Sequence, residues 1–140
     1  MKEPVKAITV RQPWAWAIIM GYKDVENRSR RTDRRGPLLI HAGQKWDPDG
    51  FLFLWELGLH RKLPRTLHRG ALVGEVRLSD SQYGYDSEWS AVGQWQWLFM
   101  SPKEFRSPLS CPGAQGFFVP DVSNHALGQV RRNAISHRRR

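Results

Sequence analysis

The stretch RQPWAWAIIMGYKDVENR, residues 11–28, contains the strongest run of local structural signals in the chain. Pro13 is tolerated at the first turn of a helix, and the apolar side chains that follow it recur at helical spacing. Gly21 supplies a C-terminal stop, because glycine adopts the left-handed conformation that ends many helices. The stretch therefore predicts a short helix over about 13–20, followed by an extended segment at 24–28.

Apolar patterning predicts strands on both sides of this helix. The clearest is 71–78, where apolar and polar side chains alternate with period two. The full set of predicted strands covers residues 5–10, 37–41, 71–78, 94–100 and 116–119. A second helix is expected over 48–59, because Asp47 is a good N-cap and Pro48 follows it at the first helical position.

The predicted fold class is α+β and mainly β, since five or six short strands accompany two or more short helices. The 140 residues have room for one core. A small closed or partly closed barrel with helices at its openings would leave few exposed strand edges. An open α+β sandwich is the alternative. We expect one domain over 1–122 and a flexible basic extension over 123–140, where no periodicity is visible.

Composition excludes several other classes of protein. The longest uncharged apolar run, 15–20, is too short to span a bilayer, and the N-terminus does not resemble a signal peptide. Cys111 has no second cysteine for a disulfide or a zinc site, and the five histidines are scattered. We therefore expect a cytoplasmic monomer with no metal, no cofactor and no membrane contact.

The net charge of +9 is concentrated in two segments. Residues 131–140 contain five arginines and no acid, and residues 28–35 contain five arginines and one aspartate, so together they account for the whole net charge. Two such clusters indicate a polyanion binder, although a terminal arginine run can also be a solvated tail. The candidates for contact with a nucleic-acid backbone are Arg30, Arg31, Arg34, Arg35, Arg131, Arg132, Arg138, Arg139 and Arg140.

A four-residue signature in the opening stretch resembles that of the ASCH domain family. The residues that match G-x-K-x-x-E-x-R are Gly21, Lys23, Glu26 and Arg28. The preceding RQPW is also typical of the family, and similar later blocks stand in order at 40–42 (IHA), 73–76 (VGEV) and 111–117 (CPGAQGF). The resemblance covers about 5–120. It implies a PUA-like β-barrel, a cleft between the barrel and the first helix, and a role linked to RNA.

The preferred functional hypothesis is binding of single-stranded nucleic acid, RNA above DNA, or of a nucleotide. Lys23 and Arg28 could hold a phosphate or polarise a carbonyl, and Glu26 could accept from an exocyclic amine. The predicted ligand-binding residues are Arg11, Gln12, Trp14, Arg28 and His41. The alternatives are a surface ion pair between Lys23 and Glu26 and a structural role for His41.

The second hypothesis is a hydrolase. One branch of the family removes an acyl group from a cytidine derivative with a lysine, a threonine and a strand glutamate; Lys23 and Glu75 match two of these, but Glu26 replaces the threonine. Other members are ribonucleases, for which Lys23 could stabilise charge and Glu26 could act as the base. The sequence leaves open whether the protein is an enzyme, and Glu75 could equally be exposed to solvent.

Overall fold

The computed structural model describes residues 3–137. The strands are β1 (Lys6–Gln12), β2 (Val25–Arg28), β3 (Gly36–Trp46), β4 (Ala71–Tyr83), β5 (Trp95–Ser110) and β6 (Ile135–Ser136). The helices are α1 (Trp14–Ile19), α2 (Pro48–Glu56) and α3 (Asn124–Arg132), with a 3₁₀ turn η1 (Leu59–Lys62). No helix in this part of the chain has the length and apolar character needed to cross a membrane.

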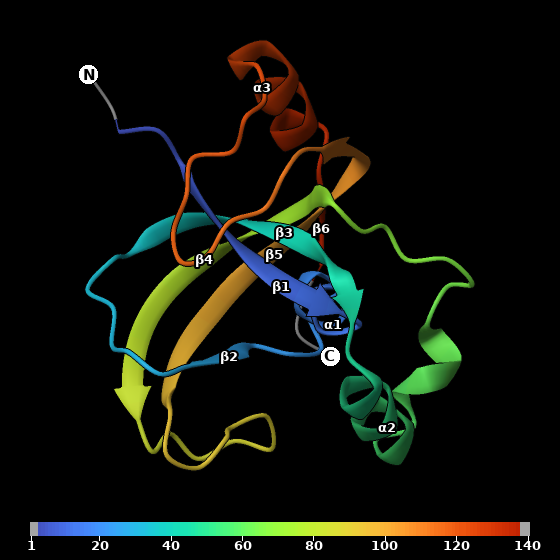
Figure 1. Ribbon diagram of the computed structural model, residues 1–140, viewed down its shortest axis with the longest axis vertical. Coiled ribbons are helices and arrows are strands. Elements are labelled where there is room, and N and C mark those ends of the chain that lie inside the picture. The colour runs from blue at the N-terminus through green and yellow to red at the C-terminus, as the bar shows by residue number, and fades with distance from the viewer. Residues whose placement is uncertain (1–2, 138–140) are drawn as a thin grey trace.

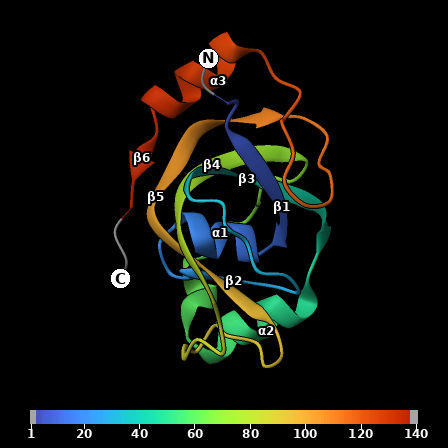
Figure 2. The same cartoon turned by 90° about the vertical axis from the view of Figure 1, so that its left-hand side faces the viewer.

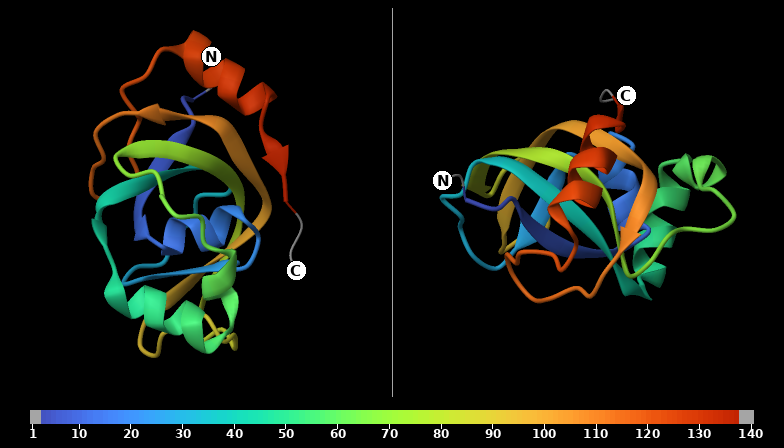
Figure 3. Two further views of the ribbon diagram at one scale, coloured as in Figure 1. Left: turned by 90° about the vertical axis from the view of Figure 1, so that its right-hand side faces the viewer. Right: turned by 90° about the horizontal axis from the view of Figure 1, so that it is seen from above.

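Five strands form a mixed sheet in the order β1-β3-β4-β5-β2, and β6 pairs with β5 (Figure 1). Only β1 and β3 run parallel; the other pairs are antiparallel. The sheet curls around α1 (Figures 2 and 3). The mainly β fold with short helices is thus confirmed. Among the described residues no ladder joins β1 to β2, so the barrel is not closed along this seam.

The main core lies between the inner face of the curled sheet and α1. Ile8 of β1, Ile18 of α1 and Leu78 of β4 belong to one buried cluster. A second cluster covers the outer face of the sheet, where Leu39 and Leu72 meet α3 through Val130. Burial on both faces explains why β3 and β4 have nearly continuous apolar sequences instead of strict alternation.

The turn from α1 into β2 follows the local signals in the sequence. The side-chain oxygen of Gln12 accepts from the backbone N–H of Trp16 at 2.9 Å, which satisfies one free donor at the helix N-terminus. Gly21 has φ +85°, in the left-handed region, and the N–H groups of Tyr22 and Lys23 both donate to the carbonyl of Ala17. The predicted stop is confirmed, and it sets Lys23 at the entrance to β2.

Several predicted boundaries were wrong. The strands β3, β4 and β5 extend well beyond the expected ranges, because register shifts let pairing continue where simple alternation fails. The segment expected as a strand at 116–119 makes only an isolated bridge, between Phe118 and Ala7. Helix α2 ends at Glu56 and η1 follows, because Gly58 adopts a left-handed conformation between them.

The absence of regular structure expected beyond residue 122 is also wrong. Ser123 caps α3 by accepting from the N–H of Ala126, and the helix buries Val130 against the sheet. β6 then pairs with β5. The division of the chain into a domain at 1–122 and an extension at 123–140 stays a prediction.

Candidate functional site

A cleft of about 790 Å³ opens along the seam between β1 and β2. Its walls come from the end of β1, from α2 and from the loop 84–94 that joins β4 to β5; β2 and the turn before it form the floor. These elements lie together at the end of the molecule opposite α3 (Figures 1 and 2). The volume is in the range of small-ligand sites in proteins.

Lys23 lies on the cleft floor and is only 4% exposed. Its ammonium donates to the carbonyl of Val25 and to Oε1 of Glu26, the latter at 3.2 Å. Burial lowers the pKa of Lys23, and the nearby Glu26 carboxylate only partly opposes that effect. The result is a cation that is poorly solvated and borders an open cavity.

Glu26 and Arg28 continue the polar chain from Lys23. The Arg28 guanidinium donates from Nε to Oε2 of Glu26 at 3.0 Å and from Nη2 to the carbonyl of Thr9 at 3.0 Å. The second bond reaches β1, so Arg28 bridges the seam that the sheet leaves unpaired. No partner for Nη1 of Arg28 lies within residues 3–137, which leaves donors for a ligand.

Aromatic side chains form the wall above this chain. The rings of Trp14, Phe53 and Trp89 contact one another with centroid separations of 5.4–6.3 Å. Trp14 is held by a 2.8 Å bond from its Nε1 to Oδ2 of Asp47, and the Lys23 ammonium lies 5.4 Å from a Trp14 ring centroid. An aromatic wall of mutually tilted rings therefore stands beside the Lys23–Glu26–Arg28 chain, and the face of one ring, Trp14, can receive a planar group.

Comparison with known proteins places this architecture in a family. The ASCH domain family model matches residues 8–109. The chain belongs to the ASCH domain family. A search of curated proteins finds no match.

Solved ASCH structures have the same fold. The crystal structure of ZmASCH from Zymomonas mobilis aligns with a TM-score of 0.53 at 14% sequence identity, covering 98% of this chain and 99% of that one. Two single-residue mutants of ZmASCH align with TM-scores of 0.56 and 0.55, also at 14% identity, each covering 95% of this chain and 100% of that one. At this identity the similarity shows the fold alone.

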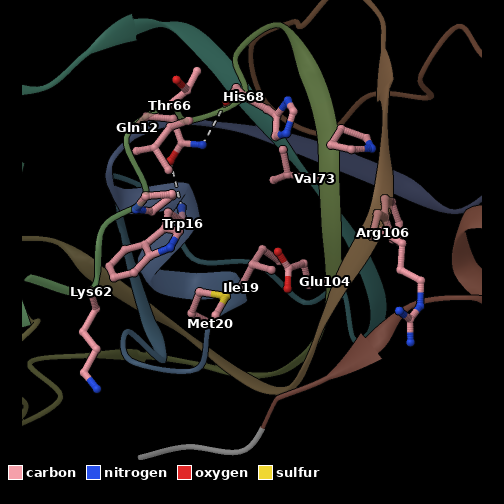
Figure 4. A pocket seen from close by; sticks show the side chains of 14 residues that line it. Gln12, Trp16, Ile19, Met20, Lys62, Thr66, His68, Val73, Glu104 and Arg106 are labelled. Carbon is pink, nitrogen blue, oxygen red and sulfur yellow. Dashed lines mark hydrogen bonds between the residues drawn. The ribbon is translucent and has the colours of Figure 1, made fainter.

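Four of the predicted ligand-binding residues divide between two places in this ASCH domain. Arg11, Trp14 and Arg28 line the cleft with Lys23 and Glu26. Gln12 points away from it into a separate hollow of about 380 Å³, where Nε2 donates to the carbonyl of His68 (Figure 4). Its two side-chain bonds hold α1 and the 63–70 segment in place, so its observed role is structural.

His41 and Glu75 do not join the cleft cluster. Nε2 of His41 donates to the carbonyl of Cys111 at 2.8 Å, and Nδ1 forms a hydrogen bond with the Thr9 hydroxyl at 3.2 Å. Both ring nitrogens of this buried histidine are thus satisfied within the fold. Glu75 accepts two bonds from Arg131, at 2.7 and 3.1 Å, and the structure does not bring it together with Lys23.

The two predicted arginine clusters lie in different parts of the molecule. The loop that carries Arg30, Arg31, Arg34 and Arg35 leaves β2 directly after Arg28, at the edge of the cleft. Its members also make local contacts: Arg31 pairs with Asp33, and Arg34 lies over the Phe117 ring. Arg131 and Arg132 are on α3, at the far end of the molecule (Figure 1). Arg138, Arg139 and Arg140 lie outside the described residues.

Sequence reasoning missed the residues that shape the cleft from a distance. Asn27 donates to the carbonyl of Trp89 and accepts from the N–H of Ala91, which fixes the 84–94 loop above β2. Gln96, fully buried on β5, bonds to Asn27 and to the same loop. Asn27 lies inside the matched signature. Its short amide side chain, which both donates and accepts hydrogen bonds, was the one sequence signal for a role in holding another segment.

Within residues 3–137 no group of three or more His, Cys, Asp or Glu side chains is arranged to hold a metal ion. The lining of the cleft holds three cations, three carboxylates and three aromatic rings: Arg11, Lys23, Arg28, Glu26, Asp47, Glu88, Trp14, Phe53 and Trp89. Such a set can bind a phosphate, stack against a base and hydrogen-bond to its edge.

Proposed function

We propose that the cleft of this ASCH domain binds a nucleotide, either free or as an unpaired nucleotide of single-stranded RNA. The observation that carries the proposal is the buried chain Lys23–Glu26–Arg28 on the floor of a cleft walled by Trp14 and Phe53. A charged chain of this kind is costly to bury, and a ligand with a complementary pattern of charge would account for its place in an open cavity.

Each group in the cleft has a defined part in this proposal. The base stacks against Trp14, whose ring is already oriented by its bond to Asp47. Glu26 accepts from an exocyclic amine of the base, since a carboxylate has more lone pairs than its two cationic partners use. The free edge of Arg28, with Lys23 on the floor and Arg11 at the rim, holds the phosphate.

For a longer strand, the arginine loop after β2 supplies contacts to the phosphate backbone. Arg30 and Arg31 are exposed there, and the loop begins at a residue that lines the cleft. Phosphate contacts of this kind add affinity without reading sequence. The preference for RNA follows from the family; the monomeric state and the cytoplasmic location expected from the sequence stay predictions.

Hydrolysis is the second candidate function, and the lowered pKa of Lys23 in an open cleft is the observation that favours it. Lys23 would stabilise developing negative charge while Glu26 moved a proton. The assay is turnover of an acylated cytidine and of single-stranded RNA, with and without divalent metal ions. Lack of turnover by the unmodified protein under all these conditions would eliminate this candidate.

The binding function is tested by fluorescence anisotropy with a labelled single-stranded RNA. We expect Lys23→Met and Arg28→Met to weaken binding about tenfold or more, because each removes a charged partner from the cleft. Lys103→Met and Arg77→Met are matched controls, since both remove an exposed cation from the sheet outside the cleft and should change affinity less than about twofold. Equal losses in all four variants would refute a specific role for the cleft.

A further inference from the structure

A row of aromatic rings covers the side of α2 that faces away from the cleft. Trp46 at the end of β3 lies 6.2 Å from Phe51, Phe51 lies 6.2 Å from Trp55, and Trp55 stacks on His60 of η1 at 3.7 Å, measured between ring centroids. We call these four residues the α2 aromatic row. Trp46 is 40% exposed and Trp55 56% exposed, which is unusual for so large an apolar side chain.

The chain beside this row is strongly basic. Residues 57–70 contain Arg61, Lys62, Arg65 and Arg69 and no acidic residue. Acidic residues elsewhere in the chain balance the positive charge of this segment, so the net charge does not show it. Assigning the whole net charge to residues 28–35 and 131–140 therefore overlooked a third basic segment. Arg65 and Arg69 line a hollow of about 450 Å³ together with Trp46, Phe51 and His60.

The α2 aromatic row is separate from the cleft. Phe53 lines the cleft, whereas Phe51 and Trp55, two positions away on either side, belong to the row. Residues two apart on a helix point in nearly opposite directions, so α2 presents one aromatic face to each site. In the described part of the chain, Nδ1 of His60 is also buried without a hydrogen-bond partner, which the fold alone does not explain.

We propose that the α2 aromatic row and its basic border form a second contact surface for single-stranded nucleic acid. Unpaired bases stack on the exposed faces of Trp46 and Trp55, and the phosphates between them contact Arg65 and Arg69. A duplex would keep its bases stacked on each other and away from the rings. Arg65 and Arg69 line the hollow beside the row, and none of the described residues that line it is a carboxylate, which suits a polyphosphate chain better than an apolar protein surface. This surface goes beyond the proposed function, because it requires no ligand in the cleft.

The experiment measures binding of a labelled twelve-residue oligouridylate to the full chain. The double variant Trp46→Ala with Trp55→Ala should lower the affinity about tenfold or more, since two stacked bases lose their platform. Leu52→Ala is the matched control: Leu52 is 59% exposed on the same helix but has no ring, so its loss should leave affinity nearly unchanged. Unchanged affinity in the tryptophan double variant would overturn the proposal.

Two further measurements separate stacking from charge and from other partners. Inorganic polyphosphate should bind the tryptophan double variant as it binds the unmodified protein, whereas Arg65→Ala with Arg69→Ala should weaken both polyphosphate and oligouridylate. Equal loss of both ligands in the tryptophan variant would contradict a stacking role. Self-association through the row, seen as a concentration-dependent dimer in sedimentation that Trp55→Ala abolishes, would also refute the proposal.

A mononucleotide distinguishes failure of this inference from failure of the cleft function. Cytidine monophosphate carries the exocyclic amine that the cleft proposal requires and is too short to reach both sites, so its binding should depend on Arg28 and not on the α2 aromatic row. Both proposals are supported if the tryptophan double variant still binds the mononucleotide but binds oligouridylate more weakly. Oligouridylate binding that depends on Arg28 alone would retain the cleft and refute the second surface.

Discussion

Burial of the Lys23 ammonium lowers its pKa. While the ammonium is charged, the same burial strengthens its attraction for an anion. Its charge is not dispersed by surrounding water, so an approaching phosphate interacts with it more strongly than with an exposed lysine. In the folded protein the neutral form is favoured relative to the unfolded chain. The charged form therefore costs stability at neutral pH, and that cost begins to fall as pH rises above the lowered pKa and is gone above the ordinary lysine pKa.

This shift predicts a pH dependence of binding. The cleft should bind cytidine monophosphate more weakly as pH rises from about 7.5 to 10, because Lys23 loses its proton below the usual lysine range. In Lys23→Arg the cation persists to much higher pH, so the affinity of that variant should stay nearly constant. Calorimetric titration of both proteins across this range provides the measurement. Parallel pH profiles would show that Lys23 is not the titrating group.

Residue-level prediction succeeded where the partners are close in sequence. Lys23, Glu26 and Arg28 share one turn and one short strand, so a linear signature indicates their cluster. Asp47 and Trp89 could not be assigned to the same cleft in that way, because α2 and the 84–94 loop reach it only through the tertiary fold. His41 was ambiguous for the same reason: its partner is a carbonyl 70 positions away.

At the scale of elements, α3 is stabilised mainly by what it packs against. It has nine residues with Gly128 near the middle, so its intrinsic helix propensity is low. Val130 enters the outer apolar cluster, and Arg131 forms a bidentate pair with Glu75 of β4. The pairing with Glu75 also raises the pKa of Arg131. The helix therefore depends on tertiary contacts, which cannot be read from the local sequence.

The pair predicts a specific loss of stability. Glu75→Gln and Arg131→Met should each lower the free energy of unfolding by about 1–2 kcal/mol, because each leaves a half-buried charge without its partner. The double variant should lose less than the sum of the two single losses. Thermal unfolding measures this coupling, and additive losses would refute the pair. Nucleotide binding should not change, because Glu75 lies away from the cleft.

At the scale of the whole molecule, the cleft and the α2 aromatic row gather at one end, around β2 and α2, whereas α3 occupies the opposite end (Figure 1). The arginine loop leaves β2 and runs along the side of the molecule. Periodicity predicted most of the strands, and the family resemblance predicted the mainly β fold that they form, but not the order of the strands. Neither could show that β1 and β2 stay unpaired, because that seam depends on the tertiary placement of the two strands, which Arg28 connects only through its side-chain bond to the carbonyl of Thr9.

The central claim, that a nucleotide binds in the cleft, is tested most directly by the indole N–H signals of the seven tryptophans in a ¹H–¹⁵N NMR titration. The titration uses each of the common ribonucleoside monophosphates in turn. We expect saturable shifts of Trp14 and Trp89, which border the cleft, and little change in Trp16, which is buried against Tyr22 and faces the separate hollow beside Gln12. Shifts confined to other tryptophans, or the absence of saturable shifts with every nucleotide, would contradict the account.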